Sequence, residues 1–168
     1  LKVLDPACGS GSFLLQAYQY LLDWYLDQYS QNPKKWKDRI VRTGSETFSL
    51  SSRERSRILL NNIYGVDIDS QAVEVTKLSL LLKALEKTPG EAIDLQLRLL
   101  HERALPDLEA NIKRGNSIVG SDFYSTRQTT LLEPVSDHAV DVFQWEREFP
   151  PIFERPDPGF DVIIGNPP

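Results

Sequence analysis

An apolar segment that ends in an acidic residue and opens directly into a glycine turn constrains the fold of this 168-residue chain most strongly. The segment ends at Asp5, the sequence D-P-A-C-G-S-G-S-F-L spans residues 5–14, and a helical spacing of apolar residues follows. This order predicts a strand, a glycine loop and a helix. Gly9 and Gly11 permit a positive φ and let a ligand approach the backbone. The loop lacks the third glycine of the dinucleotide fingerprint and the lysine of a P-loop, so it is not built for a pyrophosphate.

Three further segments are predicted strands that contain or lead to a polar residue at their ends. Residues 63–68 contain Asp67, residues 112–116 end at Asn116, and the apolar run 160–164 leads to Asn166. Strands that alternate with helices predict a doubly wound, mostly parallel α/β sheet. The run 160–164 further predicts a strand covered on both faces. Ligands of such sheets bind at the carboxyl ends of the strands, where all of these polar residues fall.

The predicted helices refine this picture. The first helix is expected to end near residue 32, and the second to run from an N-cap at Asp69 or Ser70 to about residue 87. Asp67 lies too early to be the cap, so it is available to accept hydrogen bonds from two ribose hydroxyls. The first helix is expected to turn six apolar residues inward: Phe13, Leu14, Ala17, Leu21, Trp24 and Tyr25.

Charge is distributed unevenly along the chain. The net charge is -5, yet residues 32–57 hold eight Lys or Arg against three Asp or Glu. This basic insertion could contact phosphates, but a solvated surface loop is the interpretation we favour. A long irregular loop is expected over residues 121–158. Trp145 and Phe149, four residues apart within it, are expected to form a packing anchor.

Composition narrows the class of protein. The single cysteine, Cys8, excludes an internal disulfide and suits a reducing, cytoplasmic environment. With only two histidines, no zinc site of the usual kind is expected, and no apolar run approaches the length of a membrane span. The absence of methionine, including at position 1, leads us to expect a piece of a longer protein.

The string over residues 5–14 resembles motif I of the amino-methylating DNA methyltransferases. G-V-D-I-D at 65–69 and G-N-P-P at 165–168 are similar to two further motifs of that family. W-x-x-x-F-P before G-F-D-V-I-I-G-N-P-P resembles the type IIG restriction-modification methylases and their phage-defence relatives. The resemblance implies the Rossmann-like fold of S-adenosylmethionine-dependent methyltransferases, incomplete here. It assigns cofactor contacts to Asp5, Ala7, Cys8, Gly9, Gly11, Asp67, Ile68 and Asn116.

The same resemblance assigns catalysis to Asn166, Pro167 and Pro168. The Asn166 side-chain oxygen and the Pro167 carbonyl would orient the amine of a base flipped out of duplex DNA, most simply N6 of adenine. The aromatic residue that stacks on the base would be residue 169. Residues 1–168 would then be the cofactor-binding part of the domain, without later strands or a recognition domain, and inactive alone.

Two other functions stay open on the sequence. Enzymes that methylate a glutamine amide in proteins also use an N-P-P motif. A non-catalytic module with a degenerate cofactor site is the alternative from another class. Cytosine N4 as the target is not separated from adenine N6.

Overall fold

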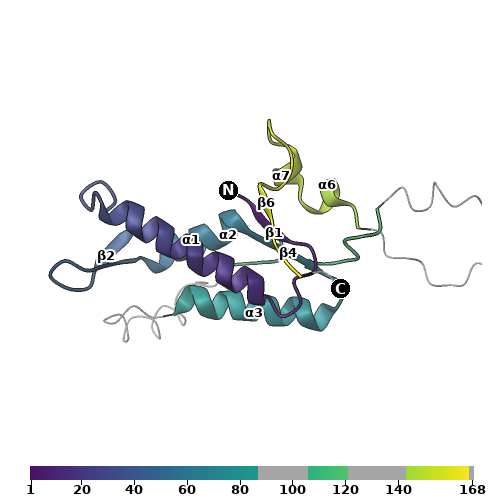
Figure 1. Cartoon of the computed structure of the whole chain (residues 1–168), viewed down its shortest axis with the longest axis horizontal. Helices are drawn as coiled ribbons and strands as arrows, with labels where there is room; N and C mark the ends of the chain where they lie inside the picture. Colours follow the sequence, from purple (N-terminus) through teal and green to yellow (C-terminus); the bar gives the residue numbers. More distant parts are fainter. Residues whose placement is uncertain (87–105, 121–142, 167–168) are drawn as a thin grey trace, which may run out of the picture.

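The computed structural model describes residues 1–86, 106–120 and 143–166 (Figure 1). Strands alternate with helices along the chain, as the sequence predicts. In order, the elements are β1 (Val3–Asp5), α1 (Ser12–Ser30), β2 (Ile40–Arg42), β3 (Phe48–Leu50), α2 (Ser52–Asn62), β4 (Ile63–Asp67), α3 (Ser70–Leu85), β5 (Ile112–Arg114), α6 (Trp145–Glu148), α7 (Pro150–Phe153) and β6 (Val162–Ile163).

Four of the strands form one parallel sheet in the order β5-β4-β1-β6. The register pairs Val3 of β1 with Ile63 of β4 and with Val162 of β6. Because the strands are parallel, their carboxyl ends share one edge of the sheet. The chain moves outward from β1 to β4 and β5 and then returns to the other side of β1 at β6, which confirms the doubly wound sheet.

Helices cover both faces of this sheet (Figure 1). On one face, Val3 and Ile63 pack with buried residues of α1, α2 and α3. On the other, Leu4 and Tyr64 pack with residues 143–153. The alternation along each strand divides the core in this way, as expected for a sheet buried on both sides.

The inward face of α1 is only partly as predicted. Leu14 and Leu21 are buried, whereas Phe13 is 50% exposed and Trp24 is 49% exposed. Both exposed residues lie on a flank of the helix that no described element covers.

Aromatic side chains fill the second face of the sheet. The rings of Trp145 and Phe149 stack with centroids 6.0 Å apart, and Phe149 meets Tyr64 of β4 edge-on at 5.8 Å. Phe149 is 1% exposed. The prediction that Trp145 and Phe149 anchor their segment by packing is confirmed.

Strand β6 is shorter and more open than predicted. It comprises two residues at the edge of the described sheet, and its Val162 and Ile163 are 37% and 69% exposed. The expectation that residues 160–164 form a strand covered on both faces is therefore wrong for the described part of the chain. Within the described ranges, no helix combines the length and the apolar character needed to cross a membrane.

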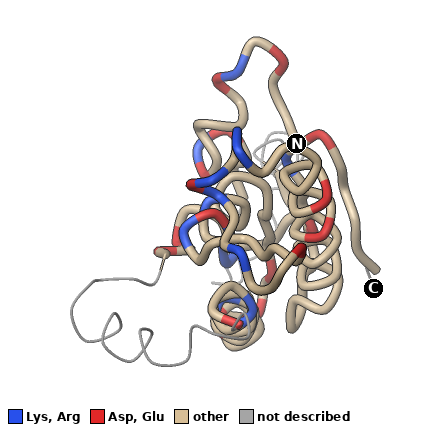
Figure 2. Tube along the Cα trace, turned by 90° about the vertical axis from the view of Figure 1, so that its left-hand side faces the viewer, with Lys and Arg blue, Asp and Glu red and all other residues tan. Residues whose placement is uncertain are grey.

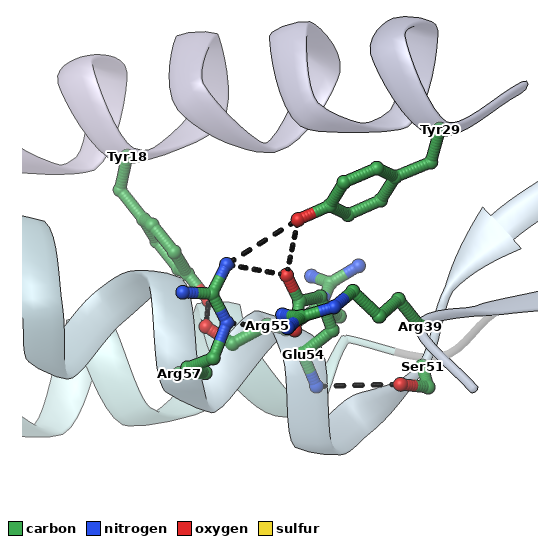
Figure 3. Close-up of polar contacts among 7 residues, drawn as sticks. All are labelled: Tyr18, Tyr29, Arg39, Ser51, Glu54, Arg55 and Arg57. Atoms are coloured by element: carbon green, nitrogen blue, oxygen red, sulfur yellow. Dashed lines mark hydrogen bonds and ion pairs between the residues drawn. The ribbon is translucent and has the colours of Figure 1, made fainter. Parts of the chain in front are cut away.

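The basic segment is folded rather than a surface loop. It contains the antiparallel hairpin of β2 and β3 and the first turns of α2, which the Ser51 side chain caps by accepting from the Glu54 amide. Glu54 itself is buried and takes hydrogen bonds from Tyr29, Arg39 and Arg57 (Figure 3). Burial alone would raise the pKa of Glu54, but these bonds outweigh it and lower that pKa. Two of the eight cations thus neutralise a buried acid.

Lys and Arg are interspersed with Asp and Glu along the trace in Figure 2. The hairpin also follows the C-terminal end of α1, whose 19 residues begin at the glycine loop. At 1.5 Å per residue, α1 separates the two regions by about 28 Å.

Candidate functional site

The carboxyl ends of the strands carry the candidate site. Asp5 ends β1, Asp67 ends β4, and the segments with Asn116 and Asn166 follow β5 and β6. Neighbouring strands lie about 4.8 Å apart, so the outer strands β5 and β6 are separated by about 14 Å. A ligand with chemically different ends could span this row of polar groups.

The glycine loop crosses this edge of the sheet between β1 and α1. Gly9 has φ +53 and Gly11 has φ +81, both in the left-handed region that glycine favours. The Cys8 amide donates to the Val66 carbonyl at 2.9 Å, and the Gly9 amide donates to Oδ2 of Asp67 at 2.7 Å. Hydrogen bonds to β4 therefore hold the loop in place.

Asp5 is the most unusual residue of the site. Its side chain is 1% exposed, and its Oδ1 accepts from the Ala7 amide at 3.1 Å. Its Oδ2 is buried without a hydrogen-bond partner among the described residues. Burial raises the pKa of this carboxyl, and the nearby charge of Asp67 adds to the increase while the Ala7 amide opposes it. A buried carboxylate oxygen with no partner is costly, and a cationic ligand group would satisfy it.

Gly165 brings the end of β6 against this carboxylate. Gly165 has φ +142, and a Cβ at this position would lie 2.6 Å from Oδ1 of Asp5. The Ile164 amide donates to the Leu4 carbonyl at 2.8 Å, which fixes the approach. Asn166, the next residue, is exposed. Gly165, the residue before Asn166, thus lies beside the acid of β1.

Three consecutive residues at the end of β4, Asp67, Ile68 and Asp69, have side chains with different surroundings. Asp67 accepts from the amides of Gly9 and Asp69, and Asp69 caps α3 by accepting from the Gln71 amide at 2.8 Å. The prediction of an N-cap at this point is confirmed. Ile68 between them is 65% exposed, an apolar surface beside two acids.

Cys8 and Asn116, two of the predicted cofactor contacts, have surroundings that the sequence does not reveal. The Cys8 thiol is buried against Gly65 and Thr76, and burial, with the charges of Asp67 and Asp5, raises its pKa to about 12. A ligand contact from Cys8 would therefore come from its backbone. The Asn116 side-chain oxygen accepts from the Ile118 amide at 3.2 Å, which leaves its amide group as a donor. Pro167 and Pro168 lie outside the described residues.

Two contacts of this region, made by Gly165 and Thr76, are not predicted by the sequence. Gly165 contacts Asp5 across 160 positions of sequence, and Thr76 of α3 donates its hydroxyl to the Gly9 carbonyl at 2.7 Å. Nothing local to either residue signals the contact. No cluster of His, Cys, Asp or Glu suited to a metal occurs among the residues that the structure describes.

The fold and the site define a class. A doubly wound parallel sheet with a glycine loop after its first strand and an acid at the end of the neighbouring strand is a Rossmann-like, nucleotide-binding arrangement. Within that class, the N-6 DNA Methylase family model matches residues 1–97, and the Eco57I restriction-modification methylase model matches residues 61–168. The chain belongs to the N-6 DNA methylases of the Eco57I restriction-modification type.

Three relatives of this chain have names that agree with membership of this family. The chain is 32% identical over 168 residues to the type II restriction enzyme and methyltransferase RM.Eco57I of Escherichia coli, covering 99% of this chain and 14% of that protein. It is 27% identical over 174 residues to the adenine-specific methyltransferase PglX of Streptomyces coelicolor, covering 100% of this chain and 12% of the relative. To the adenine-specific methyltransferase BrxX of Escherichia coli it is 32% identical over 109 residues, covering 62% and 7% respectively. The chain thus spans a small part of each relative's length.

Proposed function

We propose that the protein containing this chain is a DNA methyltransferase of a restriction-modification system, which transfers the methyl group of S-adenosylmethionine to N6 of an adenine flipped out of the duplex. Oδ2 of Asp5, buried and without a hydrogen-bond partner among the described residues, carries the proposal, since it lies beside the glycine loop at the sheet edge where such cofactors bind. The relatives PglX and BrxX are named as adenine-specific methyltransferases, which favours adenine over a protein glutamine as the substrate. Degeneration of the site is disfavoured because Oδ2 of Asp5 remains buried with no hydrogen-bond partner among the described residues.

The residues present fit the cofactor. Its ammonium group would pair with Oδ2 of Asp5, and its two ribose hydroxyls would donate to Asp67, whose oxygens each retain a lone pair. The exposed face of Ile68 suits one side of the adenine ring, and the Asn116 amide suits its edge. Around Gly9, no atom lies within 4 Å of the point a Cβ would occupy, so the loop can be approached. The amides of Ala7, Cys8 and Gly11 already donate to Asp5, Val66 and Cys8, so these three residues would contribute van der Waals contact with the cofactor.

When bound, the cofactor supplies an electrophilic methyl group, and the residues after β6 orient the nucleophile. The side-chain oxygen of Asn166 would accept a hydrogen bond from the adenine amine, and the family resemblance assigns a second acceptor to the carbonyl of Pro167. Two such acceptors would direct the nitrogen lone pair toward the methyl group, and the resemblance assigns Pro168 to the same motif. The amine is itself the nucleophile, so no covalent enzyme intermediate is needed.

Titration calorimetry of the full-length protein tests the cofactor assignment. We expect S-adenosylhomocysteine, the demethylated product, to bind and NAD to bind more weakly or not at all, because the loop is not shaped for a pyrophosphate. Tighter binding of NAD would overturn the assignment.

Asp67, the last residue of β4, and Asp69, the N-cap of α3, are expected to have different roles: Asp67 binds the cofactor and Asp69 stabilises the helix. Asp67→Ala should weaken S-adenosylhomocysteine binding by about 10-fold to 150-fold, the equivalent of ~1.5–3 kcal/mol for charge-assisted hydrogen bonds. Asp69→Ala should instead lower the free energy of unfolding by about 1 kcal/mol through loss of the α3 cap. Calorimetry and chemical denaturation of both variants check the pair. Equal losses of affinity would refute the role of Asp67.

A cytoplasmic location suits the single cysteine of the chain. Phosphate contacts from residues 32–57 are not needed, because that segment begins about 28 Å from the glycine loop along α1 and its Arg39 and Arg57 pair with Glu54.

A further inference from the structure

We infer that Thr76 of α3 is a positioning residue for the glycine loop, setting the affinity for S-adenosylmethionine without touching it. The inference rests on the proposed function. Thr76 is 0% exposed, so its side chain cannot reach a ligand. Its hydroxyl donates to the Gly9 carbonyl at 2.7 Å, across 67 positions of sequence.

Gly9 is held on both of its backbone polar groups. Its amide donates to Asp67 and its carbonyl accepts from Thr76, so β4 and α3 each fix one side of the same residue. Asp67 is expected to bind the ribose directly. Thr76 is therefore the contact through which the conformation of the loop can be altered without removing a ligand group.

Gly11 shows how closely Thr76 approaches the loop. A Cβ on Gly11 would lie 2.9 Å from both Cγ2 and Oγ1 of Thr76. The Gly11 amide also donates to the Cys8 carbonyl at 2.8 Å, which closes the turn over this side chain. The loop is folded directly onto Thr76, and its second glycine is needed where the contact is tightest.

A threonine at position 76 is better explained by its hydrogen bond to the glycine loop than by packing in the core. Thr76 lies in the interior of α3 between Val73 and Leu80, both buried. A β-branched polar residue has lower helix propensity than alanine or leucine, and an apolar residue would suit this core. The hydroxyl is satisfied by the loop carbonyl, so the polar group is useful only because the loop is there.

Removing the hydroxyl should loosen the loop before the cofactor binds. The Gly9 carbonyl would lose its partner, and binding would then have to order the loop, which lowers affinity rather than the rate of transfer. In the full-length protein, we expect Thr76→Val to weaken S-adenosylhomocysteine binding by about tenfold and to raise the KM for S-adenosylmethionine similarly. The value of kcat should change by less than about twofold. Thr76→Ser, which keeps the hydroxyl, should restore the affinity.

Tyr18→Phe is the matched control. Tyr18 is also 0% exposed, and its hydroxyl donates to the Arg55 carbonyl at 2.9 Å, away from the loop (Figure 3). Its loss should lower Tm and leave cofactor affinity unchanged. Should Thr76→Val fail to fold because its methyl group crowds the Gly9 carbonyl, Thr76→Ala removes the hydroxyl without that crowding and carries the same expectation.

The outcomes separate the two proposals. Wild-type protein that does not bind S-adenosylhomocysteine would overturn the proposed function and this inference with it. Wild-type binding together with unchanged affinity in the Thr76 variants, or an equal loss in Tyr18→Phe, would overturn the inference alone. A loss of kcat at unchanged KM would also contradict it.

Discussion

Replacing Asn166 with alanine in the full-length protein should reduce methyl transfer at least about 100-fold while leaving cofactor affinity nearly unchanged. The Asn166 side chain is exposed after β6, and the cofactor groups are assigned to other strand ends. Loss of its oxygen removes one of the two acceptors that would orient the target amine. The rate of methyl transfer should therefore fall while cofactor binding is unaffected. Single-turnover transfer to DNA and calorimetry with S-adenosylhomocysteine measure the two effects.

Asn166→Asp is the control for this prediction, because it retains an acceptor oxygen at the same position. It should keep more activity than Asn166→Ala. If Asn166→Ala loses cofactor affinity in proportion to its rate, Asn166 belongs to the cofactor site and its assignment to the target base is wrong.

Replacing Asp5 with asparagine should weaken S-adenosylhomocysteine binding by about 10-fold to 150-fold, as expected for a charge-assisted bond to the ligand ammonium. The variant keeps an oxygen for the Ala7 amide but removes the buried charge. Because the unpartnered Oδ2 destabilises the free protein, Asp5→Asn should have an equal or higher Tm at neutral pH. Calorimetry and thermal unfolding together check this combination of weaker binding and undiminished stability.

The pH dependence of cofactor affinity is the control for this role of Asp5. Burial raises the pKa of Asp5 above its ordinary value of 3.8, so its contribution to the stability of the free protein is present below 3.8 and lost as the pH rises through the raised value. Binding of an ammonium group requires the carboxylate, so affinity should increase over that same rise in pH. The Asp5→Asn variant should show no such increase. Wild-type affinity that is flat with pH would argue that Asp5 does not hold a cation.

The parallel sheet and the polar residues at its carboxyl ends could be predicted because each of its strands leads into a local signal. An acid or an amide follows every apolar segment, and parallel pairing brings all of these ends to one edge of the sheet. The cap at Asp69 and the stack of Trp145 on Phe149 were similarly local, since both depend on residues fewer than five positions apart.

The hairpin and helix within the basic segment cannot be predicted from its composition, because composition does not report a strand or helix period. Ser51 and Glu54 form the Ser-x-x-Glu spacing of a helix N-terminus, which could have indicated α2. The high density of Lys and Arg suggested a solvated surface instead. That Glu54 is buried could not be predicted, since Tyr29 and Arg39 reach it from α1 and from the segment leading into the hairpin.

The contacts that shape the site depend on long-range packing. Gly165 resembles any glycine after a strand until β6 is placed beside β1, where only a hydrogen atom fits against Asp5. Thr76 resembles a helix residue without a function until α3 packs against the glycine loop. The exposed flank of α1 at Phe13 and Trp24 likewise reflects which elements lie beside the helix, which helical periodicity does not report.

Transfer of a tritiated methyl group from S-adenosylmethionine to mixed-sequence DNA by the full-length protein, followed by nucleoside analysis, tests the central claim most directly. The proposed function predicts label in N6-methyladenine, lost in Asn166→Ala and strongly reduced in Asp5→Asn at limiting cofactor. Label in methylated cytosine would contradict the choice of base. Label in a protein glutamine, or none in DNA from a protein that binds S-adenosylhomocysteine, would contradict the assignment as a DNA adenine methyltransferase.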